Sequence, residues 1–282
     1  MSRAAWVVIF VCAQCGVIYA QGAPAPHVYM RHGVIERHAG SATVKADAAD
    51  PLMDAIAAVS EEYGWVVDYE DPPYKGGTDV TYHPSPRPGV PSYKIVAGGA
   101  FQSTYTEMPK MWSSPAAKLE VLQKIVSDYN QSGNPGNFVV RDLADGSFDV
   151  IGTSIHDSSG ADIAIEPILD TTISIPSAAR SVGATLDAIL HALPAKSLNF
   201  CPPNLAMAGP VTVGGTGVPA RDLLMQLVDR LGGNWAWQLV YQVGPTPEYL
   251  FGVVLVQRAE YDIFGRRRLV PVGPATVPGG SP

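Results

Sequence analysis

The chain is short of cysteine, and this limits how it can be held together. It has 3 cysteines among 282 residues. Cys12 and Cys15 lie within the first twenty residues, so removal of that stretch would leave Cys201 alone. An internal disulfide is then excluded, and stability has to come from packed apolar cores. Since nothing near Cys201 would lower the pKa of its thiol, we interpret it as a buried structural residue and not as a nucleophile.

Basic residues are also scarce. Lys and Arg number 19 against 26 Asp and Glu, which gives a formal net charge of −7 at pH 7. A nucleic-acid partner requires a basic stripe, and only Arg266-Arg267-Arg268 offers one. We interpret this run as a solvated face, with contact to anionic lipid or to a partner as the alternative. No nucleic-acid partner is expected.

Long apolar runs are missing too. A membrane span requires about 20 apolar residues, and no uninterrupted run of that length occurs. The longest candidate follows the early cation Arg3, runs from Ala4 to Val11, continues more weakly to Tyr19 and precedes the small residue Ala20. This arrangement predicts a signal peptide over residues 1–20. An uncleaved anchor is the alternative. We therefore expect an exported protein, periplasmic or extracellular, with no transmembrane span after cleavage.

The chain does contain a recurring helix-then-strand pattern. Apolar residues keep helical spacing from Leu223 to Leu231, Gly232-Gly233 breaks the helix, and Trp235–Tyr241 alternates as a strand does. Weaker versions occur three times upstream. We predict a duplicated α+β protein in which each small module places two helices on a mixed or antiparallel sheet, a βαββαβ-like arrangement. The predicted segments are an N-terminal stretch (21–48), a first module (49–158), a second module (165–258) and a disordered tail rich in proline and glycine (259–282).

Caps, breakers and turn signals place the elements of each module. In the first module we expect a helix opened by Asp50-Pro51 and ended by Gly64, strands at 65–69 and 93–97, a helix opened by Ser114-Pro115, and a hairpin of 138–142 with 148–151. In the second we expect strands at 171–175, 198–200 and 211–213, helices around 186–193 and 219–231, and closing strands at 235–242 and 249–257. The polar run from His156 to Asp162 is expected to connect the modules.

The second module resembles a known family at four places: Thr171–Ile175, Thr185–Leu190, Pro210–Val213 and Pro219–Leu224. Their apolar spacing is similar to that of the secretin and TonB short N-terminal (STN) domain, over about residues 165–258. In that family a strand leads into a helix, two strands follow, and a second helix begins. The resemblance implies a periplasmic binding and assembly module, normally fused to an outer-membrane barrel. Because no barrel sequence follows here, we do not expect a transport or secretion role.

The first module also resembles exported bacterial proteins of unassigned function, through Trp65–Tyr74 and Asp79–Thr81. An enzymatic hypothesis comes from Arg31-His32-Gly33, which resembles the phosphorylated motif of histidine phosphatases, with His156-Asp157 as a later His-Asp pair. That motif belongs at the end of a central strand in a large sheet, and here it follows only a few residues of mature chain. A polar N-terminal strand is the simpler interpretation.

Metal and phosphate sites are also weakly indicated. His27, His32 and His38 with Glu36 are suitable ligand types, but their spacing fits no closed zinc site, so neither a metal nor another cofactor is expected. The Gly214–Gly217 segment precedes a helix and lacks the companion residues of a P-loop or a dinucleotide fingerprint. We interpret it as a flexible loop between a strand and a helix.

We predict a non-enzymatic binding or assembly module of the bacterial cell envelope, with an envelope protein or peptide as partner. Its mechanism would be surface complementarity or strand addition along a sheet edge, for which Tyr249–Gln257 is a candidate, although Val253–Val256 is apolar enough for a central strand instead. The alternative is a hydrolase of unknown type with its site between the modules, where the Tyr69–Tyr74 and Pro84–Pro91 loops would meet. The candidate binding residues are Trp65, Tyr69, Glu70, Asp71, Tyr74, Trp235 and Trp237. For Trp235 and Trp237, a place in the core is favoured over a binding platform.

Overall fold

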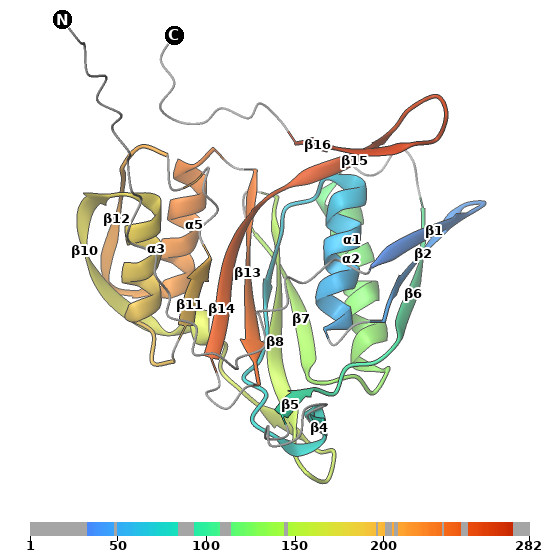
Figure 1. Ribbon diagram of the computed structural model, residues 1–282, viewed down its shortest axis with the longest axis horizontal. Helices are drawn as coiled ribbons and strands as arrows, with labels where there is room; N and C mark the ends of the chain where they lie inside the picture. The colour runs from blue at the N-terminus through green and yellow to red at the C-terminus, as the bar shows by residue number, and fades with distance from the viewer. Residues whose placement is uncertain are drawn as a thin grey trace, which may run out of the picture. The chain divides into compact units, whose positions relative to one another are not determined.

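The computed structural model describes residues 33–47, 50–83, 93–107, 114–143, 146–195, 197–200, 205, 208–232, 234–243 and 248–272. The predicted signal peptide, residues 21–32 of the N-terminal stretch, the Pro84–Pro91 loop and Cys201 lie outside these ranges. The fold is α+β, as predicted: helices and strands alternate along the chain, and the strands form several sheets (Figure 1).

The first two helices begin at the predicted prolines, although neither Asp50 nor Ser114 makes a side-chain cap hydrogen bond. Helix α1 spans Pro51–Tyr63 and ends at Gly64, whose φ of 71° is left-handed and whose N–H donates to the Ser60 carbonyl at 2.7 Å. Helix α2 spans Pro115–Asn130 after Ser114. Its buried side chains include most of the predicted stripe, from Leu122 to Tyr129. Proline at the first helical position and an apolar stripe were therefore sufficient signals for both helices.

The first half of the chain places these helices between two sheets. Strand β2 (Ser41–Ala46) pairs antiparallel with β6 (Phe101–Thr106) and with β1 (Val34–His38). On the other side, β3 (Val67–Glu70) pairs parallel with β8 (Phe148–His156), which pairs antiparallel with β7 (Asn137–Asp142). One core contains apolar residues from both helices and from both of these sheets. Between β3 and β6 lie the 3-10 turn η1 (Gly77–Asp79) and the antiparallel pair β4 (Val80–His83) and β5 (Tyr93–Val96).

The second half repeats this layout. Strand β10 (Thr172–Arg180) pairs antiparallel with β12 (Val211–Pro219), and β14 (Glu248–Leu255) pairs parallel with β11 (Ser197–Phe200) and antiparallel with β13 (Trp235–Gln242). Helices α3 (Val182–His191) and α5 (Ala220–Arg230) pack between them in a second core. The order β2-α1-β3-β6-α2-β7-β8 thus matches β10-α3-β11-β12-α5-β13-β14, pairing by pairing. We call these two sets of elements the first and second repeat.

The two repeats do not keep separate sheets, which corrects the expectation that each module has its own. Strand β13 pairs parallel with β3, so the strand order is β11-β14-β13-β3-β8-β7 in one continuous sheet. The pairing places Leu239 beside Glu70. Since neighbouring residues on paired strands share a face, Glu70 points toward the second core while Tyr69 points into the first. Helices α1 and α2 therefore cover one face of the sheet and α3 and α5 the other (Figure 1).

Three further expectations are corrected. The polar run from His156 to Asp162 is a tight turn, because β9 (Asp162–Ala164) folds back on the end of β8; the connection to the second repeat continues through the 3-10 turn η2 (Ile168–Asp170). The segment 249–257 is not an edge, since β14 lies between β11 and β13. The first part of the predicted tail forms a hairpin of β15 (Gln257–Tyr261) and β16 (Arg267–Pro271), because its strands pair antiparallel over five residues each. Residues 273–282 lie outside the described ranges.

Candidate functional site

A buried arginine connects the two repeats. Arg221 lies in the first turn of α5 and is 5% exposed. Its guanidinium donates to Asp149 of β8 and to Asp170 of η2, both at 2.8 Å, and also to Glu70 of β3. Its Cζ atom lies 5.4 Å from the centre of the Trp237 ring. The first repeat thus provides two of the carboxylates that balance a cation of the second.

A second carboxylate pair completes this junction. Asp68 accepts the backbone N–H of Trp237 at 2.8 Å and is hydrogen-bonded to Asp149. Burial, and then the charge of Asp149, raise the pKa of Asp68 well above its usual range. Burial also raises the pKa of Asp149, while Arg221 opposes that rise. Because the pKa of Asp68 is the one raised well above its usual range, we assign the proton between the two carboxyl groups to Asp68.

Asp71, the residue that follows β3, joins β3 to β13. Its backbone N–H donates to the Leu239 carbonyl at 2.9 Å, and its carboxylate accepts the Tyr241 N–H at 3.0 Å and the Tyr69 hydroxyl at 2.7 Å. The Tyr74 hydroxyl approaches the same carboxylate at 3.4 Å. Burial raises the pKa of Asp71 well above its ordinary value. These contacts replace strand pairing where β3 ends.

The predicted binding residues are therefore mostly interior. Six of them have side chains that are 2% exposed or less, which corrects the prediction of a binding surface at Trp65, Tyr69, Glu70, Asp71, Tyr74 and Trp237. The reason is that both faces of β3 and β13 are covered, one by each pair of helices. Trp237 stacks on Phe251, so the core alternative holds for it. Trp235 is half-buried against the second core. The other side of the predicted cleft, the Pro84–Pro91 loop, lies outside the described residues.

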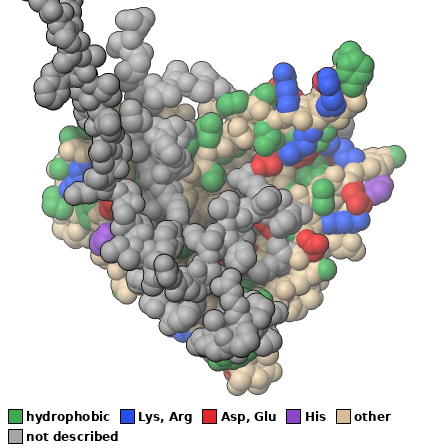
Figure 2. Space-filling model, viewed as in Figure 1, with side chains coloured by type: hydrophobic (Ala, Val, Ile, Leu, Met, Phe, Trp, Pro, Cys, Tyr) green, Lys and Arg blue, Asp and Glu red, His purple; other side chains and the backbone are tan. Residues whose placement is uncertain are grey.

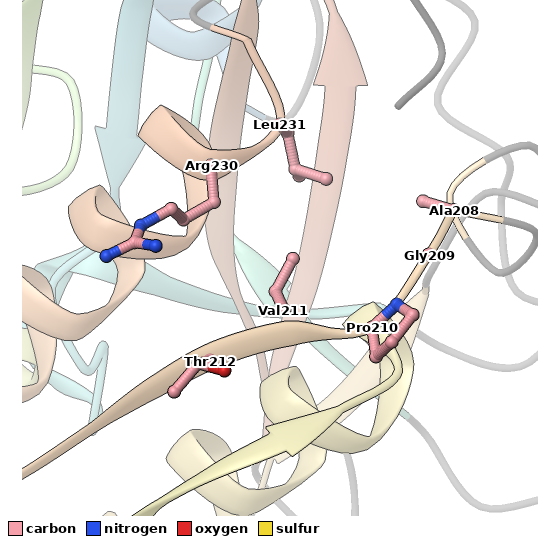
Figure 3. A pocket seen from close by; sticks show the side chains of 7 residues that line it. All are labelled: Ala208, Gly209, Pro210, Val211, Thr212, Arg230 and Leu231. Carbon is pink, nitrogen blue, oxygen red and sulfur yellow. The ribbon is translucent and has the colours of Figure 1, made fainter. Parts of the chain in front are cut away.

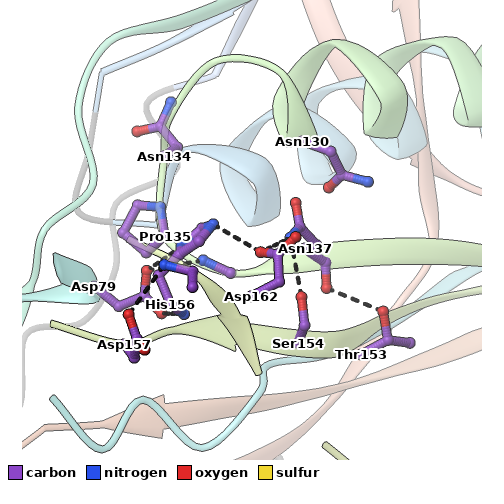
Figure 4. A network of polar contacts seen from close by, with 12 residues as sticks. Asp79, Asn130, Asn134, Pro135, Asn137, Thr153, Ser154, His156, Asp157 and Asp162 are labelled. Atoms are coloured by element: carbon purple, nitrogen blue, oxygen red, sulfur yellow. Dashed lines mark hydrogen bonds and ion pairs between the residues drawn. The ribbon is translucent and has the colours of Figure 1, made fainter. Parts of the chain in front are cut away.

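A histidine and an aspartate, which the sequence did not single out as a pair, meet near the turn after β8 (Figure 4). Asp79 is 1% exposed and accepts both the His156 backbone N–H at 2.7 Å and a contact from the His156 Nδ1 at 2.6 Å. The Nε2 atom of the same ring lies 3.2 Å from the Asp162 carboxylate. Asn137 donates to that carboxylate at 2.7 Å and to the Ser154 hydroxyl at 2.9 Å.

This arrangement orients an imidazole as a catalytic dyad does, but it does not supply the rest of an active site. In a nucleophilic triad the outer ring nitrogen faces a hydroxyl or thiol. Here the outer nitrogen of His156 faces Asp162, and both ring nitrogens are held by carboxylates. Asp157 does not join His156 as a pair; it accepts N–H groups of Ser159 and Ala161 in the turn. The cluster fixes η1 against the hairpin of β8 and β9.

One depression lies where α5 ends and β12 begins (Figure 3). It has a volume of about 380 Å³ and is lined by Ala208, Gly209, Pro210, Val211, Thr212, Arg230 and Leu231. Arg230 is the single charged residue in this lining. An enzyme site needs several converging titratable groups, so this depression offers no chemistry of its own.

The exposed tip of the β15–β16 hairpin differs from the rest of the described surface. Ile263 is 93% exposed and Phe264 is 75% exposed. Arg266 follows them in the same turn, and the exposed guanidiniums of Arg258 and Arg268 lie along the two strands, where both pair with Glu260. Figure 2 shows hydrophobic and basic side chains together at this corner of the molecule. The sequence contained the basic run, but the adjacent Ile-Phe pair was assigned to a tail.

The remaining sequence candidates have no supporting geometry. Arg31 and His32, like His27, lie outside the described residues. Glu36 pairs with Lys45 at 2.6 Å, and no group of three or more possible metal ligands occurs in the described part of the chain. Gly214–Gly217 is not a loop but part of β12. Glycine is needed at position 214 because this residue passes against the backbone of β10, where an added Cβ would lie 2.5 Å from the Ser177 Cα.

Among the helices that the structure describes, none is both long and apolar enough to cross a bilayer. Comparison with known proteins adds no assignment: the chain matches no protein-family model, no curated protein and no solved structure.

Proposed function

We propose that this protein is an exported, non-enzymatic binding or assembly module of the bacterial cell envelope, and that it engages its partner through the tip of the β15–β16 hairpin. The observation that carries the proposal is the exposure of Ile263 and Phe264 side by side on a turn. Exposed apolar groups that are grouped and rimmed by polar residues mark interaction sites. Single exposed residues elsewhere on a surface do not.

Two further features support an assembly role. The order β10-α3-β11-β12-α5 agrees with the order that the resemblance to the STN domain implies. The chain also joins its own two repeats by pairing β3 with β13, which is strand addition between folded units. Export and an envelope partner rest on the sequence of residues 1–20 and on that resemblance.

A site-specific photocrosslink tests the proposal. A benzophenone amino acid replaces Phe264 in the full chain, and a matched protein carries it at Val34, an exposed apolar position on β1. Each protein is irradiated in a native envelope fraction. We expect adducts, to an envelope protein or to lipid, from position 264 that are absent from position 34. Equal labelling from the two positions, or none from position 264, would contradict a role for the hairpin.

A further inference from the structure

We infer that the partner of the β15–β16 hairpin is the surface of an anionic lipid bilayer. This inference rests on the proposed function, since it names the class of partner for the same hairpin. Three observations carry it: the rigidity of the tip, the charge of the hairpin relative to the chain, and the convex form of the apolar group.

The turn is held rigid by Asp262. Its carboxylate accepts the Phe264 N–H at 2.8 Å and the Arg266 N–H at 2.9 Å, and it pairs with the Arg266 side chain at 2.6 Å. The Asp262 carbonyl accepts the Gly265 N–H at 2.9 Å, and Gly265 has a left-handed φ of 75°. The backbone thus holds Ile263 and Phe264 outward before any partner arrives, which lowers the entropy cost of binding.

The charge of the hairpin is opposite to that of the whole chain. Residues 257–271 contain four arginines (258, 266, 267 and 268) against Glu260 and Asp262, an excess of two positive charges in a chain of net charge −7. Arg258, Arg266 and Arg268 share the two hairpin carboxylates, which leaves one positive charge in excess, while Arg267 is paired with Glu61 and Glu62 of α1. Anionic headgroups attract such basic clusters, whereas the acidic remainder of the protein is repelled.

The last strand pair before the turn, Tyr261 with Arg267, is fixed to α1, and the side chains of Ile263 and Phe264 in the turn stay exposed. The Tyr261 hydroxyl donates to Glu62 of α1 at 3.0 Å, and Arg267 contacts Glu61 at 3.1 Å. The tip extends past α1 (Figure 1). A protein partner would need a pocket shaped for two protruding side chains. A bilayer needs none, because its headgroup region accepts small apolar protrusions beside basic residues.

Vesicle cosedimentation of the full chain tests this inference. Vesicles of phosphatidylcholine alone are compared with an equal mixture of phosphatidylcholine and phosphatidylglycerol. We expect binding to the mixed vesicles that weakens as salt is raised. The double variant Ile263→Ser/Phe264→Ser should bind the mixed vesicles at least about tenfold more weakly, because it removes the two exposed apolar side chains that the bilayer would bury. The control Val34→Ser/Ile163→Ser, which removes exposed apolar groups elsewhere, should bind as the unmodified protein does.

A charge variant separates the electrostatic part. Arg258→Gln/Arg268→Gln should lose most of the preference for phosphatidylglycerol and keep its weak binding to phosphatidylcholine. Absence of wild-type binding to mixed vesicles, or unchanged binding by the tip variant, would overturn the inference. If vesicles fail while position 264 still crosslinks to a protein in the envelope fraction, the lipid inference is wrong and the proposed function stands. If both fail, neither stands. Far-ultraviolet circular dichroism confirms that each variant is folded.

Discussion

At the scale of single residues, the central feature is a buried carboxyl group whose pKa the fold raises. Asp68 is 5% exposed, and burial is the largest cause of its raised pKa. In its protonated form it donates to Asp149 while it accepts the Trp237 N–H. A group whose folded pKa is raised stabilises the fold fully below its unfolded pKa, near 3.8, and loses that contribution as pH rises through the folded value.

The variant Asp68→Asn tests this assignment. The amide NH₂ can donate to Asp149 and the amide oxygen can accept the Trp237 N–H, so at acidic pH we expect a stability within about 1 kcal/mol of wild type. At alkaline pH the variant should be the more stable protein, because asparagine has no proton to lose. Urea unfolding across this pH range measures the difference.

Asp68→Ala serves as the control, since it removes both hydrogen bonds and should cost about 2 kcal/mol or more at acidic pH. A difference between wild type and Asp68→Asn that does not change with pH would show that Asp68 is ionised in the folded protein.

At the scale of elements, the edge of the long sheet at β7 is covered by a side chain. Asn130, the last residue of α2, accepts the Phe138 N–H at 2.9 Å and donates to the Phe138 carbonyl at 2.9 Å. It thereby makes both hydrogen bonds that an added strand would make at this position. Native proteins protect sheet edges by such means, since open edges lead to aggregation.

We predict that Asn130→Ala costs about 1–2 kcal/mol of stability and makes self-association depend on protein concentration. The cost arises because two backbone groups lose their partners. Analytical ultracentrifugation and urea unfolding measure the two effects. Gln123→Ala, at an exposed position of the same helix, should change neither. A monomeric Asn130→Ala protein at all concentrations would mean that the edge is protected by something else.

The elements that the sequence predicted are those with large apolar stripes, caps or turn glycines. Strand β6 was missed although its residues alternate between buried and exposed. One of its inward residues is Ser103, which donates to Asp128 of α2, and the outward residues include two threonines. Strand β2 was missed because it buries small residues, Ala42 and Ala46, together with Thr43 and Val44. Hydrophobic periodicity is weak where small and hydroxyl residues fill the core.

At the scale of the whole molecule, the shared sheet was the feature that the sequence could not indicate. Asp68 and Glu70 alternate with Val67 and Tyr69, a pattern typical of a strand with one wet face. In the structure that acidic face is dry, because Arg221 lies over it from an element about 150 residues away. A local pattern cannot show which distant cation will neutralise a carboxylate. A surface position was therefore predicted for the candidate binding residues, because nothing local in the sequence shows that distant elements cover them.

The junction predicts that the two repeats unfold together. Replacing Arg221 with methionine leaves Glu70 and Asp149 buried without their cation, and we expect a loss of about 3–5 kcal/mol. The loss should appear equally at both repeats. Hydrogen exchange of backbone amides in α2 and in α5, followed by mass spectrometry, measures each repeat separately.

Arg268→Met, at a 70% exposed side chain, is the matched control and should change stability by less than about 1 kcal/mol. Faster exchange in α5 alone after Arg221→Met would contradict the prediction, since it would show that each repeat is stable without the other.

The join between the repeats also has a direction. By position in the repeat, β13 corresponds to β7 and β3 corresponds to β11. The contact between β13 and β3 is therefore heterologous. It leaves β11, the counterpart of β3, at one end of the sheet and β7, the counterpart of β13, at the other. Contacts of this type do not close on themselves and, if copied between molecules, would grow into a polar filament. Asn130 occupies the growing end at β7. The side-chain amide of Asn130 thus blocks the addition of a further repeat to a sheet that contains two.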